Sequence, residues 1–168
     1  AAEENIVARD IALARQTGAR LHIAHVSTQG SVELVRWGKQ KGVRLTAEAT
    51  PHHLTLTEDR IMGRTVVGAA ASGPCVLSLD AYDTNAKVNP PLRTEADRKA
   101  VVEGLNDGTI DAIATDHAPH AWEDKACEFG LAAVGISGLE TALGSLMGLV
   151  HSGQVKLELL VQKLTSGP

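Results

Sequence analysis

The sequence has few aromatic residues, no excess of positive charge and no long apolar segment. Phe, Trp and Tyr make up 2% of the 168 residues, which leaves little for stacking on nucleic-acid bases. The net charge is −4, whereas proteins that bind nucleic acid non-specifically usually carry a basic patch. No run reaches the roughly 18 apolar residues that cross a bilayer. We therefore expect neither a nucleic-acid partner nor a membrane span.

Cysteine is also scarce. Cys75 and Cys127 are far apart and form no Cys-x-x-Cys motif, which is typical of a reduced compartment and argues against a structural disulfide. The first residues, AAEENIVARD, are charged and helical in character, unlike a secretory signal. We expect a cytoplasmic protein in which residues 1–168 form one domain with a sizeable core.

Helix-like and strand-like segments alternate along most of the chain. Apolar residues recur at helical spacing in residues 5–18, 31–42, 95–108, 138–153 and 156–167. Short apolar runs typical of buried strands occupy residues 20–27, 43–50 and 109–116. Strands that alternate with helices predict βαβ units, and hence an α/β fold with a parallel sheet.

Several boundaries carry their own signals. Gly18 and Gly42 follow predicted helix ends, and Ser31 and Thr94 are predicted N-caps. Residues 58–93 give no clear period, and TVVGAAASGPCVLSLD is compatible with a strand, a helical turn or a loop. The conformation of residues 58–88 is therefore left open.

Histidine and aspartate side chains follow the end of each predicted strand. They are His25 after the first strand, His52 and His53 after the second, and Asp116, His117 and His120 after the third. Parallel strands end at one edge of a sheet, where ligands bind in α/β folds. Imidazole and carboxylate are ligands of catalytic zinc, which lowers the pKa of a bound water toward about 7. The sequence predicts a metal site at this edge.

Each of these residues also has a plainer interpretation. His22, within the first strand, is expected to face the helical layer. His52 and His53 follow a proline and are expected to support the site, for example by bonding a loop carbonyl, rather than to bind metal. Asp116 is alternatively the N-cap of a turn, with His117 as the filler of that turn.

Two further stretches bear on ligand binding. In KVNPPLR, Pro90 restricts Asn89 to extended backbone, so a stiff loop presents an amide to a substrate carboxylate or carbonyl. A plain turn is the alternative. In VGISGLET, backbone N–H groups before a helix could meet an anion, and an ordinary N-cap region is the alternative.

Five motifs together resemble one enzyme family. HIAHVST, TAEATPHHL, KVNPPLR, DGTIDAIATDHAPH and GISGLET occur in this order. The sequence is similar to the dihydroorotases of the amidohydrolase superfamily, in particular to the one-chain bacterial type, over almost the whole chain. NPPLR combined with TDHAPH distinguishes this pattern from hydantoinases and allantoinases.

The resemblance implies a (β/α)8 TIM barrel with a two-zinc centre. It implies that His25 is a zinc ligand and that Asp116 binds zinc and shuttles the catalytic proton. Asn89 and His120 would hold the substrate carboxylate, and a backbone amide, best matched by Gly135, would contact the substrate.

The implied reaction is the reversible conversion of carbamoyl aspartate to dihydroorotate in pyrimidine biosynthesis. In hydrolysis, water attacks the ring amide carbonyl, and the aspartate takes its proton and passes it to the leaving nitrogen. The partners implied are this small-molecule substrate, further copies of the chain in a homo-oligomer, and aspartate transcarbamoylase.

The chain departs from the family pattern in three ways. It lacks the His-x-His-x-Arg strand that supplies two zinc ligands and a substrate arginine. Its 168 residues are also fewer than the roughly 250 that a (β/α)8 barrel typically takes. We therefore expect the C-terminal half of the barrel, inactive alone, with an incomplete set of strands. The stretch between Met62 and Tyr82 is longer than expected, and AAVG replaces the more usual Pro-Phe-Gly before Gly135.

Two alternative functions remain open. One is a non-catalytic dihydroorotase-like subunit that binds aspartate transcarbamoylase, although such relatives typically lose their metal ligands. The other is a hydantoinase-type cyclic-imide hydrolase, which has the same metal chemistry but needs no residues for a substrate carboxylate.

Overall fold

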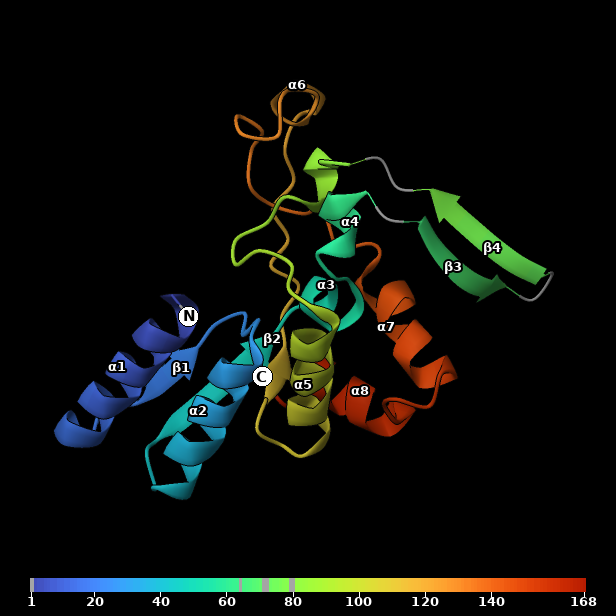
Figure 1. Ribbon diagram of the computed structural model, residues 1–168. Coiled ribbons are helices and arrows are strands. Elements are labelled where there is room, and N and C mark those ends of the chain that lie inside the picture. The colour runs from blue at the N-terminus through green and yellow to red at the C-terminus, as the bar shows by residue number, and fades with distance from the viewer. Residues whose placement is uncertain (1, 64, 71–72, 79–80) are drawn as a thin grey trace.

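The computed structural model describes residues 2–63, 65–70, 73–78 and 81–168 (Figure 1). The longer helices are α1 (Ala2–Thr17), α2 (Gln29–Gln40), α5 (Glu95–Asn106), α7 (Ala142–His151) and α8 (Leu157–Thr165). The short ones are α3 (Pro51–Thr55), α4 (Asp59–Met62), the 3-10 turn η1 (Thr84–Ala86) and α6 (Trp122–Lys125). None of the helices in the described part of the chain combines the length and the apolar character needed to span a bilayer.

Three strands form a parallel sheet. They are β1 (Leu21–Ile23), β2 (Leu45–Ala49) and β5 (Ala112–Ile113), in the order β1-β2-β5. Ile23 pairs with Ala47, and Ala49 pairs with Ile113, so all three strands run in the same direction. The expected α/β fold with parallel strands is confirmed.

The helices pack along this sheet and enclose the main core (Figure 1). Fully buried side chains come from α1, α2, the sheet, α5 and α7, and include Ile11, Val35, Ala47, Leu105 and Leu146. Burying a side chain the size of leucine stabilises a fold by about 1.5–3 kcal/mol. This shared core fixes the sheet and therefore the positions of the strand ends.

A second, smaller core lies beyond the carboxyl ends of the strands. We call residues 56–63, 81–93 and 117–138 the edge lobe, because they form the loops that follow β2 and β5 and contain α4, η1 and α6 (Figure 1). Ala86, Val88 and Leu92 are its buried centre, with Leu56 and Ile136 packed against them. The lobe therefore has apolar packing of its own, separate from the main core.

The open middle of the sequence contains an antiparallel hairpin. Strands β3 (Thr65–Ala70) and β4 (Gly73–Ser78) pair from Thr65–Ser78 to Ala70–Gly73. The hairpin extends away from the helices and the parallel sheet (Figure 1). Its two strands occupy most of the stretch between Met62 and Tyr82, which is longer than the family pattern leads us to expect. Residues 64, 71–72 and 79–80 of this stretch lie outside the described residues.

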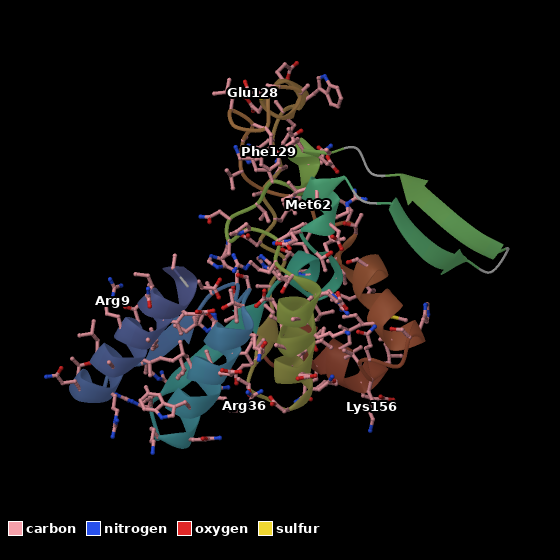
Figure 2. The ribbon with its side chains drawn as sticks, in the orientation of Figure 1. Arg9, Arg36, Met62, Glu128, Phe129 and Lys156 are labelled. Atoms are coloured by element: carbon pink, nitrogen blue, oxygen red, sulfur yellow. The ribbon has the colours of Figure 1, made fainter. Side chains whose placement is uncertain are left out.

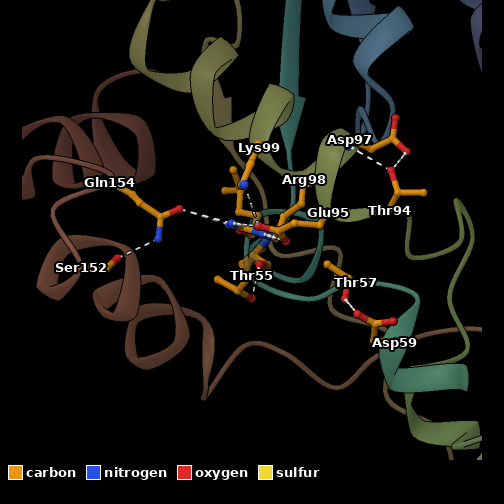
Figure 3. A network of polar contacts seen from close by, with 12 residues as sticks. Thr55, Thr57, Asp59, Thr94, Glu95, Asp97, Arg98, Lys99, Ser152 and Gln154 are labelled. Atoms are coloured by element: carbon orange, nitrogen blue, oxygen red, sulfur yellow. Dashed lines mark hydrogen bonds and ion pairs between the residues drawn. The ribbon is translucent and has the colours of Figure 1, made fainter. Parts of the chain in front are cut away.

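Helix boundaries agree with the capping signals, with two exceptions. Thr94 caps α5 as predicted, and its Oγ1 accepts the N–H of Asp97 (Figure 3). Ser31 is not the N-cap of α2. The N-cap is Thr28, whose Oγ1 accepts the backbone N–H of Ser31. Helix α2 therefore begins three residues earlier than a cap at Ser31 would place it. The expected helix over 138–153 begins only at Ala142.

The start of α5 is also tied to its neighbours. Arg98 donates to the carbonyl of Leu54 at 3.0 Å and to the side chain of Gln154 at 3.3 and 3.4 Å (Figure 3). These bonds join α5 to α3 and to the loop between α7 and α8. They help to fix the helix layer behind the strand ends.

Candidate functional site

The loop after β1 presents His25 in a constrained conformation. Its φ of 39° lies in the left-handed region, which residues other than glycine rarely adopt. Glu3 of α1 holds this loop, because its carboxylate accepts the backbone N–H of Ser27 at 3.1 Å and also the Ser27 hydroxyl. The Nδ1 atom of His25 is buried and has no hydrogen-bond partner. A buried imidazole nitrogen without a partner, on a loop that is held in place, fits the role of a metal ligand.

His53 links the end of β2 to the loop that carries Asn89. Its Nδ1 lies 2.9 Å from Oγ1 of Thr50, and its Nε2 lies 3.0 Å from the carbonyl oxygen of Pro90. The carbonyl can only accept, so Nε2 carries the proton and donates it to Pro90. The expectation that this histidine pair bonds a loop carbonyl is confirmed for His53.

His52 is kept neutral by its surroundings. Burial lowers its pKa to about 3, and the neighbouring His53 and His25 add to that shift. Its Nε2 is buried without a hydrogen-bond partner. Three imidazoles thus lie close enough at this edge to influence one another electrostatically.

A cavity of about 590 Å³ brings two of the predicted site residues together. His25 and Asn89 both line it, along with Glu3, His22 and Arg93. The Nε of Arg93 is buried without a hydrogen-bond partner, and it lies 4.0 Å from the carboxylate of Asp97. Sequence reasoning did not single out Arg93, although it ends the KVNPPLR motif.

His22 does not face the helical layer, so that expectation is wrong. Leu21 and Ile23 pack with the main core, and alternation along β1 turns His22 to the opposite face of the sheet. There its Nδ1 lies 2.8 Å from Oγ1 of Thr46, and its Nε2 lies 3.2 Å from the Glu48 carboxylate. The adjacent strand therefore supplies both of its partners.

Asp116 and His117 follow β5 at the same edge of the sheet as His25. Asp116 is exposed and has a φ of 49°, and the next helix, α6, begins only at Trp122 with Ala121 as its N-cap. His117 does not only occupy a turn position, because its side chain bonds a distant segment. Its Nδ1 accepts the N–H groups of Gly138 and Leu139 at 3.2 and 3.1 Å. These bonds hold the segment before α7 in a non-helical form, which explains the late start of that helix.

His120 lies close to Gly135. A Cβ on Gly135 would lie 2.9 Å from Nε2 of His120 and 2.7 Å from Cβ of Ala118, and the φ of Gly135 is 147°. His120 itself bonds the carbonyl of Val134 at 3.0 Å. The N–H of Gly135 donates to the carbonyl of Lys87 at 2.9 Å. A substrate contact through this amide would have to replace that bond.

The predicted residues thus form two groups at one edge. His25 and Asn89 share the cavity, and His120 and Gly135 lie close together in the edge lobe. Asp116 follows β5, the strand that pairs with β2. Within the described residues, no three His, Cys, Asp or Glu side chains are grouped as a metal site. The described residues therefore do not form a three-ligand metal site by themselves.

No family model matches the chain. Over 99% of its length, it is 51% identical to a dihydroorotase of Thermoanaerobacter sp. (strain X514) and 52% identical to one of Pelotomaculum thermopropionicum. By sequence, this chain resembles dihydroorotases. It spans 35% of the length of each of these two dihydroorotases.

Solved structures of related enzymes have the same arrangement of elements. L-hydantoinase (dihydropyrimidinase) from Arthrobacter aurescens superposes with a TM-score of 0.82 at 28% identity, over 98% of this chain and 34% of that one. A D-hydantoinase superposes with a TM-score of 0.76 at 25% identity, over 94% and 32%. The chain therefore resembles dihydroorotases in sequence and superposes on part of two hydantoinases in structure.

Proposed function

We propose that the protein containing this chain is a zinc-dependent dihydroorotase, which interconverts carbamoyl aspartate and dihydroorotate in pyrimidine biosynthesis. In this proposal, residues 1–168 are the C-terminal part of a (β/α)8 catalytic barrel. The observation that carries it is the 51% identity to a dihydroorotase over 99% of the chain. The sheet also supports it, because β1 and β5 run parallel on either side of β2, and His25 and Asp116 follow their carboxyl ends.

The proposed metal ligands in this chain are His25 and Asp116. The unused, buried Nδ1 of His25 suits this role. Two zinc ions need more ligands than these two residues provide, so the others would come from the rest of the parent protein. When bound, zinc would polarise the amide carbonyl and lower the pKa of a neighbouring water.

The other residues would bind and orient the substrate. Asn89 and His120 would hold its carboxylate, and Gly135 would let the backbone approach the ring closely. Asp116 would take the proton of the attacking water and deliver it to the ring nitrogen as the C–N bond breaks. The same carboxylate would serve both steps if it met both the metal and the substrate.

The direct test is Asp116→Ala in the full-length protein. Loss of a general base that also binds metal should lower kcat for dihydroorotate by at least about 10²–10⁴-fold. Asp124→Ala is a matched control, because Asp124 is an exposed aspartate on α6. Full activity of the Asp116→Ala protein would end the proposed mechanism.

A hydantoinase-type function is the second candidate, because the superposed solved structures quoted above are hydantoinases. The two functions differ in the substrate carboxylate, which hydantoin lacks. Rates on dihydroorotate and on hydantoin, measured on the same preparation, separate them. Faster turnover of hydantoin would favour the second candidate.

A non-catalytic subunit is the remaining alternative. We infer a lower rank for it, because His25, Asp116, Asn89 and His120 are all present. Assembly as a homo-oligomer, association with aspartate transcarbamoylase and a cytoplasmic location stay predictions. The isolated 168-residue chain should not turn over dihydroorotate, because two ligands hold zinc poorly.

A further inference from the structure

Two lysines of the edge lobe bind backbone carbonyl oxygens with their ammonium groups. The Nζ atom of Lys125 lies 2.6 Å from the carbonyl oxygen of Gly135, 2.8 Å from that of Ala133, 3.1 Å from that of Thr84 and 3.5 Å from that of Lys87. The residue is only 9% exposed. The three shortest contacts use the three N–H groups that only a protonated lysine has.

Lys87 is surrounded by backbone carbonyl oxygens in the same way as Lys125, and we call each such group of carbonyl oxygens a cage. Its Nζ lies 2.8, 3.1 and 2.7 Å from the carbonyl oxygens of Phe129, Gly130 and Ala132. It also lies 5.5 Å from the centre of the Phe129 ring, within the range of a cation–π contact. Phe129 marks the far part of the lobe (Figure 2), so this lysine reaches across from the 81–93 segment to the 117–138 segment.

The two cages meet at the candidate substrate residues. The carbonyl of Lys87 accepts the N–H of Gly135 and also faces Nζ of Lys125. Lys87 lies two residues before Asn89, and Gly135 lies so close to His120 that a Cβ on it would be 2.9 Å from the His120 Nε2 atom. One network of bonds thus connects the loop of Asn89 with the loop of His120.

Joining the two segments of the lobe through buried ammonium groups costs free energy that the packing of the lobe alone does not require. Burial of an ammonium group is unfavourable, and it lowers the pKa of Lys125, with the nearby Lys87 adding to the shift and Asp83 opposing it. Apolar packing could join the two segments without that cost. Directed N–H bonds fix carbonyl positions, and therefore the neighbouring backbone, more narrowly than apolar contacts do.

We propose that Lys125 and Lys87 are positioning residues for the carboxylate-binding side of the substrate site. They act through the backbone and fix the relative positions of Asn89, His120 and Gly135. The inference rests on the proposed function, because it takes Asn89 and His120 as the residues that hold the substrate carboxylate and Gly135 as a neighbouring substrate contact.

The test compares Lys125→Met and Lys87→Met with wild type in the full-length protein. Hydrogen exchange without substrate should show faster exchange of backbone amides in residues 118–135. Since misplacement of about 1 Å can cost about 10²-fold, KM for dihydroorotate should rise at least about tenfold. The metal ligands are untouched, so kcat should stay within about threefold and zinc content should not change. Lys156→Met is the control, because Lys156 is exposed and far from the lobe (Figure 2).

Different results overturn the positioning role of the lysines and the proposed function. A KM within about twofold of wild type in both variants overturns the proposal. Loss of zinc and of thermal stability in both variants also overturns it, because the lysines would then serve the fold as a whole. If wild type does not hydrolyse dihydroorotate, the proposed function fails. The exchange data alone then decide whether the lysines order this lobe.

Discussion

His22 and His25 show how one short strand can give two histidines different roles. They are three residues apart, yet His22 pairs with Thr46 and Glu48 on the open face of the sheet. His25, beyond the strand, keeps a buried nitrogen free. The difference arises because alternation along β1 fixes the direction of His22, whereas the Glu3–Ser27 bonds fix the loop that carries His25.

At the same scale, Gly135→Ala should damage the substrate site. The new methyl would meet Ala118 and His120 at under 3 Å, and the positive φ is unfavourable for alanine. We expect KM for dihydroorotate to rise at least about tenfold. Gly144→Ala is the control, because nothing lies within 4 Å of a Cβ at that helical position. Equal KM values for the two variants would contradict this view of Gly135.

His52 should make stability depend on pH. Its folded pKa of about 3 lies below the ordinary 6.5, so the unfolded chain binds a proton that the folded chain does not. The full stability is therefore present above pH 6.5 and is lost progressively as the pH falls toward 3. Between pH 7.5 and 5.5, the free energy of unfolding in urea should fall by about 1.4 kcal/mol more in wild type than in His52→Gln. An equal fall in both proteins would show that His52 titrates normally.

At the scale of the element, the caps decide where helices begin. The Thr94 side chain accepts from the N–H of Asp97 and donates to its carboxylate at 2.7 Å. Thr94→Ala should lower the free energy of unfolding by about 1 kcal/mol. Thr17→Ala is the matched control near the other end of a helix, where the hydroxyl bonds the Leu13 carbonyl. A loss no larger than that of the control would mean that α5 does not depend on this cap.

The alternation of helices and strands could be predicted from sequence because it reflects local apolar periodicity. The cap of α2 was misplaced by three residues, since Thr28 and Ser31 are both good capping residues and only the backbone decides between them. The β3–β4 hairpin could not be predicted, because its small residues have no clear period. The start of α7 depends on His117, which is 25 residues away from Ala142 and is invisible to periodicity.

At the scale of the whole molecule, the sequence predicted which residues gather at the sheet edge but not what holds them there. His25 and Asp116 follow strands, and the order β1-β2-β5 brings those strand ends to one edge. Glu3, Lys87 and Lys125 were missed. Their partners are backbone groups distant in sequence, and no motif marks a lysine that will be buried against carbonyl oxygens.

His25 and Asp116 are proposed to serve one metal centre, and the zinc content of the protein tests this most directly. It should be measured per chain on the full-length protein and on His25→Ala, Asp116→Ala and His22→Ala. We predict zinc in wild type and in His22→Ala, and a loss of at least about half in each of the other two variants. A metal-free wild type, or unchanged zinc in both His25→Ala and Asp116→Ala, would contradict the account.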